Sequence, residues 1–188
     1  MKSHNVAASL FSLTPKLKLL WLTRILRLLS VAYIAWATVR VFSWWLDSTR
    51  VVVNFGRYVE RDISGAHEIQ RIQALALDCI ELALLIAALV FAWKAMSLLN
   101  EEHQFSTHAS SYLARCGWLI TMCQTFSLMM RPIKTFLMTA HLPVAEQVFK
   151  WSFMPTDLLA TLLCAVVLCF AYMMHWAAEV AEENRGFV

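Results

Sequence analysis

The stretch LDCIELALLIAAL (residues 77–89) is apolar at nearly every position, yet Asp78 and Glu81 interrupt it. The apolar run continues on both sides, over residues 72–98, and about 20 mostly apolar residues are enough for a helix to span a bilayer. A carboxylate at the centre of a membrane helix costs about 2.5–3.5 kcal/mol, so both acids must face protein, water or a cation. The stretch therefore predicts a membrane helix with a polar partner.

The composition extends this prediction to the whole chain. Of 188 residues, 60% are hydrophobic and only 15% are charged, whereas soluble domains have about 45–50% apolar and about 25% charged residues. The apolar residues gather in four runs, which predict spans at residues 25–46, 72–98, 114–136 and 158–178. We therefore expect one domain over residues 1–188, an all-α integral membrane four-helix bundle. The net charge of +3 is too small to indicate a nucleic-acid partner.

The connection between the first two runs, residues 47–70, is the longest one. It contains RVVVNFGRYVER (residues 50–61), whose β-branched residues and turn-prone NFG are compatible with a short hairpin. At the other end of the first run, Thr14 and Pro15 fit a helix N-cap followed by proline at the first helical position.

Basic residues flank the start of the first span. They are Lys2, Lys16, Lys18, Arg24 and Arg27. Lysine and arginine gather on the cytoplasmic side of membrane helices, and the first helix usually dominates the orientation. With four spans, both termini are then expected in the cytoplasm.

The first span offers a partner for the two acids. Arg40 lies six residues from the end of that span at Leu46, hence about 9 Å deep, and Asp78 lies six residues from the start of the next at Ile72. Antiparallel neighbours would place them level, so we expect an intramembrane polar cluster of Arg40, Asp78 and Glu81, with Arg131 available to the second acid. A structural ion-pair cluster, a proton or cation path and a partner-facing site all remain open as its role.

A second polar group closes the last span. It consists of Glu179, Glu182 and Glu183, which lie near one another on a helix and repel at its C-terminus. Such acids need cations, and Arg115 is available at the same predicted membrane face. This end is either simply solvated or a docking surface for another protein.

The sequence contains no enzyme signature and no metal or cofactor motif. GxSxG, HExxH and Gly-rich phosphate loops are absent, and the chain has only four glycines. The five cysteines form no CxxC pair, and the methionines and cysteines of the second half recur at no metal-binding spacing. Core packing explains both sets better than copper or haem, so no metal, cofactor or catalytic residue is expected.

Two segments of the second half resemble a known family. EEHQFSTHASSYLARCGWLI (residues 101–120) is a polar loop with FS that leads into an LxRxGW-type start of a span. AAEVAEENRGFV (residues 177–188) ends a span with acids, then EN and a final Val. Together they resemble the bacterial four-helix membrane family catalogued as domain of unknown function 2975, over residues 93–188. The resemblance implies a small bacterial inner-membrane protein with a regulatory partner, and it assigns no catalytic residues.

These observations favour a non-enzymatic membrane protein. In the bilayer it would act through other membrane subunits or a regulatory protein, as a regulatory or accessory subunit of a membrane complex. The alternative is a small transporter or channel that uses the cluster of Arg40, Asp78 and Glu81 as a polar path.

Overall fold

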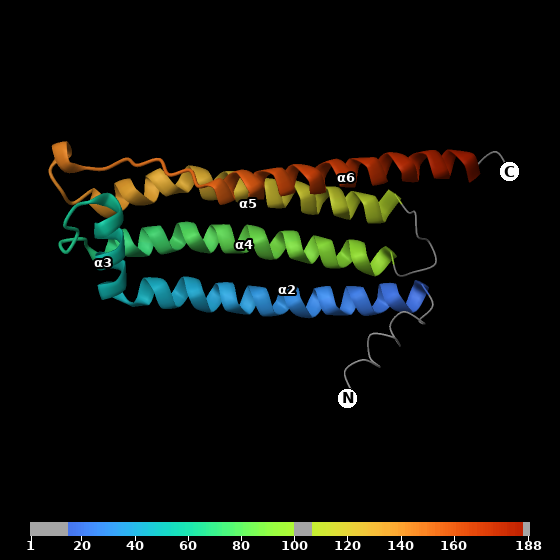
Figure 1. Ribbon diagram of the computed structural model, residues 1–188, viewed down its shortest axis with the longest axis horizontal. Coiled ribbons are helices and arrows are strands. Elements are labelled where there is room, and N and C mark those ends of the chain that lie inside the picture. Colours follow the sequence, from blue (N-terminus) through green and yellow to red (C-terminus); the bar gives the residue numbers. More distant parts are fainter. Residues whose placement is uncertain (1–14, 100–106, 186–188) are drawn as a thin grey trace, which may run out of the picture.

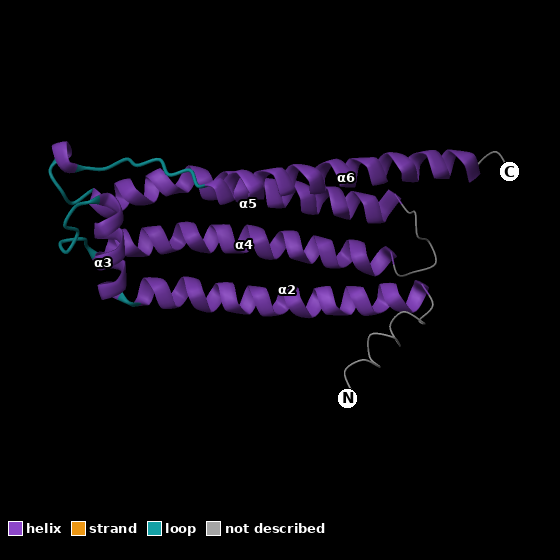
Figure 2. Ribbon diagram, viewed as in Figure 1, coloured by secondary structure: helices purple, strands orange, loops and turns teal. Residues whose placement is uncertain are grey.

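The computed structural model describes residues 15–99 and 107–185, and the regular elements of these residues are all helices (Figure 1). They are α2 (Pro15–Leu46), α3 (Ser48–Val59), α4 (Glu68–Leu99), α5 (Thr107–Thr139), the short 3-10 helix η1 (Val144–Glu146) and α6 (Pro155–Arg185). The expectation of an all-α chain is confirmed, since Figure 2 shows no strand in the described part of the chain.

The predicted hairpin in the first connection is wrong, because residues 48–59 form the helix α3. Asp47 caps this helix, and its Oδ1 accepts a hydrogen bond from the backbone N–H of Arg50 (3.1 Å). Val51, Phe55 and Val59 are four residues apart, so they share one helix face, and the two valines are buried there. Arg57 lies on the exposed side. The β-branched residues suggested a strand, but their spacing is that of an amphipathic helix.

Three described helices are long and apolar enough to cross a membrane. Their apolar stretches are Leu20–Leu46 in α2, Glu68–Leu98 in α4 and Pro155–Ala181 in α6. Three of the four predicted spans fall within these stretches. The fourth lies in α5, which is as long as the others but carries more polar residues, including Arg131 and Lys134.

The long helices follow one another in space as they do in sequence. Extensive contacts join α2 to α4, α4 to α5 and α5 to α6, whereas α2 and α6 are not an extensively packed pair (Figure 1). α3 lies across the ends of the long helices and contacts α2 and α5. We call this the α3 end, and α2 begins and α6 ends at the opposite, terminal end. The arrangement leaves one side of α2 unpacked, so a closed four-helix bundle is not confirmed.

The main cluster of buried apolar side chains lies beneath α3. It joins α2, α3, α4 and α5 and consists of Trp45, Val51, Val59, Ile63, Ala74 and Met138. Away from it the contacts are mostly between single helix pairs. Between α5 and α6, a Cβ on Gly117 would lie 3.1 Å from Leu168 Cδ1 and 3.3 Å from Leu168 Cα. Only glycine fits at this position without a displacement of α6.

Local capping defines where α4 and α6 begin. Gln70, the third residue of α4, accepts a hydrogen bond from the backbone N–H of His67 through its side chain (2.9 Å). Asp157 is the third residue of α6 and accepts from the N–H of Met154 in the same way (2.7 Å). In the turn before α4, the backbone N–H of Ser64 donates to Asp62 Oδ1 (2.9 Å), and this bond lowers the pKa of Asp62 below its ordinary value.

Candidate functional site

A polar cluster joins α2, α4 and α5 near the α3 end. Lys134 Nζ of α5 forms an ion pair with Asp78 Oδ1 of α4, and it lies 3.8 Å from Glu81 Oε2, one turn further along the same helix. The other oxygen of Asp78, Oδ2, accepts a hydrogen bond from the indole Nε1 of Trp45 (2.6 Å). Trp45 is itself buried in the apolar core beneath α3. One carboxylate therefore links three helices.

The cluster is largely shielded from its surroundings, but unevenly. The side chain of Lys134 is 14% exposed and that of Asp78 is 20% exposed, whereas Glu81 is 33% exposed and lies at the edge. Lys134 already pairs closely with Asp78, so Glu81 receives the weaker, longer interaction. Two carboxylates thus share one ammonium group, and the cluster has an excess of one negative charge when all three groups are ionised.

The predicted ion pair of Arg40 with Asp78 or Glu81 is wrong, since Lys134 occupies that place. Among the described residues Arg40 makes no ion pair; it is exposed, and its guanidinium carbon lies 5.1 Å from the centre of the Trp36 ring. The prediction assumed that α2 and α4 end at the same level. Trp45 instead makes the contact with Asp78, and Arg40, five residues further along α2, lies about 7.5 Å deeper than Trp45.

The direction of the Arg40 side chain also keeps it from the two acids. In a helix the Cα–Cβ bond tilts toward the N-terminus, so a long side chain leans over the preceding turn. For Arg40 that turn carries Trp36, whose ring also lies next to Tyr33 (5.9 Å between ring centres). Tyr33, Trp36 and Arg40 form an exposed row on α2, which we call the α2 stripe.

Arg131 has a different partner from the one predicted. Its guanidinium binds both oxygens of Asp157 in α6, with Nη1–Oδ2 at 2.6 Å and Nη2–Oδ1 at 2.7 Å. Such paired charge-assisted bonds are short and directional. The side chain of Asp157 is 8% exposed and also caps the first turn of α6. This pair therefore fixes the start of α6 against α5.

The extended chain before α6 runs along α5 and is held by a regular set of bonds. Thr139 and Thr135 accept through their hydroxyl oxygens from the backbone N–H groups of Val148 (3.0 Å) and Lys150 (3.2 Å). Arg131 donates to the carbonyl of Ser152 (3.0 Å). Four helical residues rise about 6 Å and two extended residues rise about 6.6 Å, so the two spacings match.

Aromatic residues alternate with the three bonded positions of this chain. In an extended segment alternate side chains face opposite ways, and Phe149, Trp151 and Phe153 are each more than half exposed. Aromatic rings at such positions are typical of the boundary between membrane and water.

The structure describes part of the predicted acidic surface at the terminal end. Glu179 Oε1 lies 3.4 Å from Nε2 of His175, and Nδ1 of that ring lies 2.9 Å from the hydroxyl of Ser110 in α5. Arg115 lies over the ring of Tyr112 (5.6 Å) and pairs with no acid of the described chain. Glu183 is exposed, and the side chain of Glu182 lies outside the described residues.

The arrangement of Ser110, His175 and Glu179 has the order of groups found in nucleophilic triads. However, Ser110 is only 5% exposed, and it connects α5 to α6 through His175. The contact is thus the terminal-end counterpart of the Arg131–Asp157 pair. This contact between Ser110 and His175 was not predicted from the sequence.

The cysteines are all free thiols, and no group of three or more His, Cys, Asp or Glu side chains in the described ranges could hold a metal ion. Cys123 donates a weak hydrogen bond to the carbonyl of Glu81 (3.6 Å) and so belongs to the α4–α5 contact.

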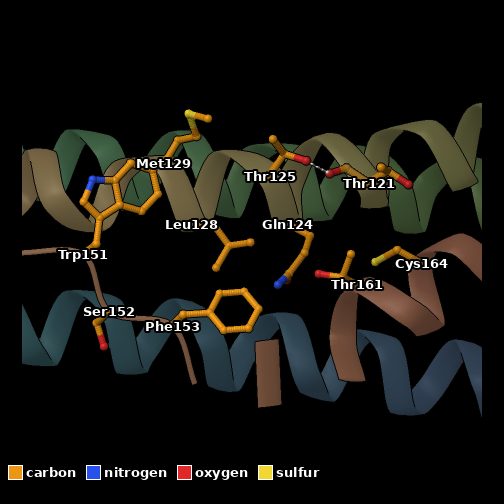
Figure 3. A pocket seen from close by; sticks show the side chains of 10 residues that line it. All are labelled: Thr121, Gln124, Thr125, Leu128, Met129, Trp151, Ser152, Phe153, Thr161 and Cys164. Carbon is orange, nitrogen blue, oxygen red and sulfur yellow. Dashed lines mark hydrogen bonds between the residues drawn. The ribbon is translucent and has the colours of Figure 1, made fainter. Parts of the chain in front are cut away.

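An apolar slot of about 240 Å³ opens between α5, α6 and the chain that precedes α6 (Figure 3). Trp151 lies at one end of it, Phe153 and Gln124 lie near the middle, and Cys164 lies toward the other end. The volume is below the 300–1,000 Å³ or so that is usual for drug-sized ligands.

Comparison of the chain with protein-family models, with curated proteins and with solved structures gave no match.

Proposed function

We propose that this protein is a non-enzymatic integral membrane protein with four spans, which acts by binding another membrane protein through the α2 stripe. It would lie in the bacterial inner membrane with the terminal end in the cytoplasm. The observation that carries the proposal is Arg40, a charged side chain exposed on the side of an apolar helix long enough to cross the membrane.

The position of Arg40 makes lipid an unfavourable neighbour. Trp45 and the amphipathic helix α3 suit the membrane boundary, so Arg40 lies about 7.5 Å further inside than Trp45. Its side chain leans toward Trp36, which is deeper still, rather than toward the boundary. An arginine at the centre of a membrane helix costs at least about 2.5 kcal/mol, and charged residues anywhere within a membrane segment almost always face protein or water.

α5 fits the role of the fourth span although its composition is more polar. It is 33 residues long and packs between α4 and α6, both of which have apolar stretches of membrane-spanning length. Its two cations near the α3 end are paired with Asp78 and Asp157 of those neighbours. The resemblance to the four-helix membrane family, and the basic residues Arg24 and Arg27 near the terminal end, agree with the proposed topology.

A photoreactive side chain placed at Val39 tests the proposal. Val39 precedes Arg40 and is 67% exposed. In native membranes we expect it to crosslink to protein, and we expect Arg40→Leu to reduce the crosslink about tenfold, since a close charge pair is worth at least 1.4 kcal/mol or so. The matched control, Arg57→Leu on the exposed side of α3, should leave it unchanged.

Crosslinking from Val39 to lipid alone, with or without Arg40, would contradict the proposal. The rival function, transport along the polar cluster, makes a different prediction: neutral Asp78→Asn and Glu81→Gln variants would abolish a proton or cation flux in vesicles and leave the Val39 crosslink intact.

A further inference from the structure

We infer that the protein covering the α2 stripe is a second copy of this chain, in which Arg40 of each copy pairs with Glu81 of the other. The inference rests on the proposed function and names its partner.

The charges of the α3-end half of the long helices indicate this pairing. Between the membrane boundary at Trp45 and the middle of the helices there are three acids and three bases, namely Asp78, Glu81, Asp157, Arg131, Lys134 and Arg40. Arg131 binds both oxygens of Asp157, and Lys134 pairs closely with Asp78. Arg40 and Glu81 remain, one without an acidic partner among the described residues and the other with a shared ammonium group at 3.8 Å.

The depths of the two groups agree. Taking the level of the Trp45–Asp78 bond as reference, Arg40 lies five residues deeper along α2 and Glu81 three residues deeper along α4. These correspond to about 7.5 Å and about 4.5 Å, so Arg40 would turn from Trp36 toward the membrane boundary to meet Glu81, a movement within the length of its side chain. A two-fold axis along the membrane normal keeps every residue at its own depth, so residues that pair across such an axis must be level.

The exposure of the groups also suits a symmetric contact. Arg40 is exposed and Glu81 is the most exposed member of its cluster, at 33%. A two-fold contact would use both groups twice, forming two Arg40–Glu81 pairs and removing two intramembrane cations from lipid. Trp36 and Tyr33 of the α2 stripe, each at least half exposed, would provide apolar area around these pairs.

Charge reversal can distinguish a pair between copies from a pair within one chain. Arg40→Glu alone and Glu81→Arg alone each place like charges opposite one another in a homodimer. When the two variants are co-expressed with different tags, the mixed dimer has both pairs complementary again. We expect each variant alone to lose co-purification of its two tagged forms by about tenfold, and the mixture to recover it to the wild-type level.

The neutral variants Arg40→Gln and Glu81→Gln serve as a folding control. Both should retain wild-type helix content and weaken self-association without abolishing expression, so a loss of self-association that these folded variants share cannot be ascribed to misfolding. The Val39 crosslinked product should have twice the 21.5 kDa mass of the chain.

Two results would overturn the inference. Recovery by Arg40→Glu with Glu81→Arg in one chain, but not by the mixture, would place the pair within a single copy. A protein that is monomeric in every combination, with Val39 crosslinked to a chain of different mass, would exclude the second copy and leave the proposed function intact.

Discussion

Replacement of Lys134 by methionine tests the assignment of the polar cluster. Methionine keeps most of the length of the lysine stem and removes its charge, so Asp78 and Glu81 would lose the ammonium group that they share. Asp78 would retain the hydrogen bond from Trp45. We expect Lys134→Met to destabilise the protein substantially, and we expect the additional change Asp78→Asn to restore part of the loss.

The magnitude follows from the burial of the three groups. Breaking a fully buried pair costs about 3–5 kcal/mol because a charge is left uncompensated, whereas an exposed pair contributes about 1 kcal/mol or less. Lys134 and Asp78 are 14% and 20% exposed, which places the expected loss near the lower end of the buried range, at about 2–4 kcal/mol. Asp78→Asn removes the stranded charge but keeps an oxygen for Trp45, so about half should be recovered.

Thermal unfolding in detergent measures the effect. For a chain of this size about 3 kcal/mol corresponds to a melting temperature lower by roughly 10 °C. Lys94→Met is the matched control, since the Lys94 side chain is exposed near the terminal end and, among the described residues, lies over the rings of Phe91 and Tyr112 without an ion pair. The reasoning fails if Lys134→Met is no less stable than Lys94→Met, or if adding Asp78→Asn lowers stability further.

Three further substitutions test other contacts. Arg131→Lys keeps the charge beside Asp157 but loses the paired geometry, and thermal unfolding should show a loss of about 1.5–3 kcal/mol; unchanged stability would mean that charge alone suffices. Gly117→Ala should cost about 1–3 kcal/mol in the same assay because the new methyl group meets the backbone of α6, and a neutral result would contradict that close approach. Asp62→Asn removes a carboxylate whose pKa is lowered by folding, so wild type should be the more stable protein well above the ordinary pKa of about 3.9 and should lose this advantage as the pH falls below it; a difference that persists in acid would refute the role of the Asp62 hydrogen bond.

The long helices were predictable because an apolar run of about 20 residues indicates a membrane-spanning helix and fits few other structures. The predicted spans lie within the observed helices, which extend further at most ends. α3 was missed because its valines were weighed by β propensity, although Val51, Phe55 and Val59 recur at helical spacing. The open packing of α2 could not be deduced, since the sequence of a lipid-facing surface resembles that of a helix–helix contact.

The sequence predicted the acidic residues of the polar cluster, but it did not predict which basic residue pairs with them. Asp78 and Glu81 stood out against an apolar run, and both do require a basic partner. The choice of Lys134 over Arg40 depends on the relative level of α2 and α4, which Trp45 sets through a contact that no sequence spacing reveals. The partner of Arg131 could have been predicted from the sequence. Asp157 is the third residue of α6, a position from which an acid commonly caps the start of a helix.

The order of the helices has a consequence for how the chain assembles. Each long helix packs mainly on the next one in sequence, so nearly all inter-helix contacts can form as soon as the later helix leaves the ribosome, and such low contact order favours rapid folding. The core beneath α3 is the exception. It needs Met138 of α5 together with Trp45, which is almost a hundred residues earlier in the chain. This contact can form only after α5 is made, and it then fixes α2, α4 and α5 relative to one another. α6 packs afterwards on the surface of α5.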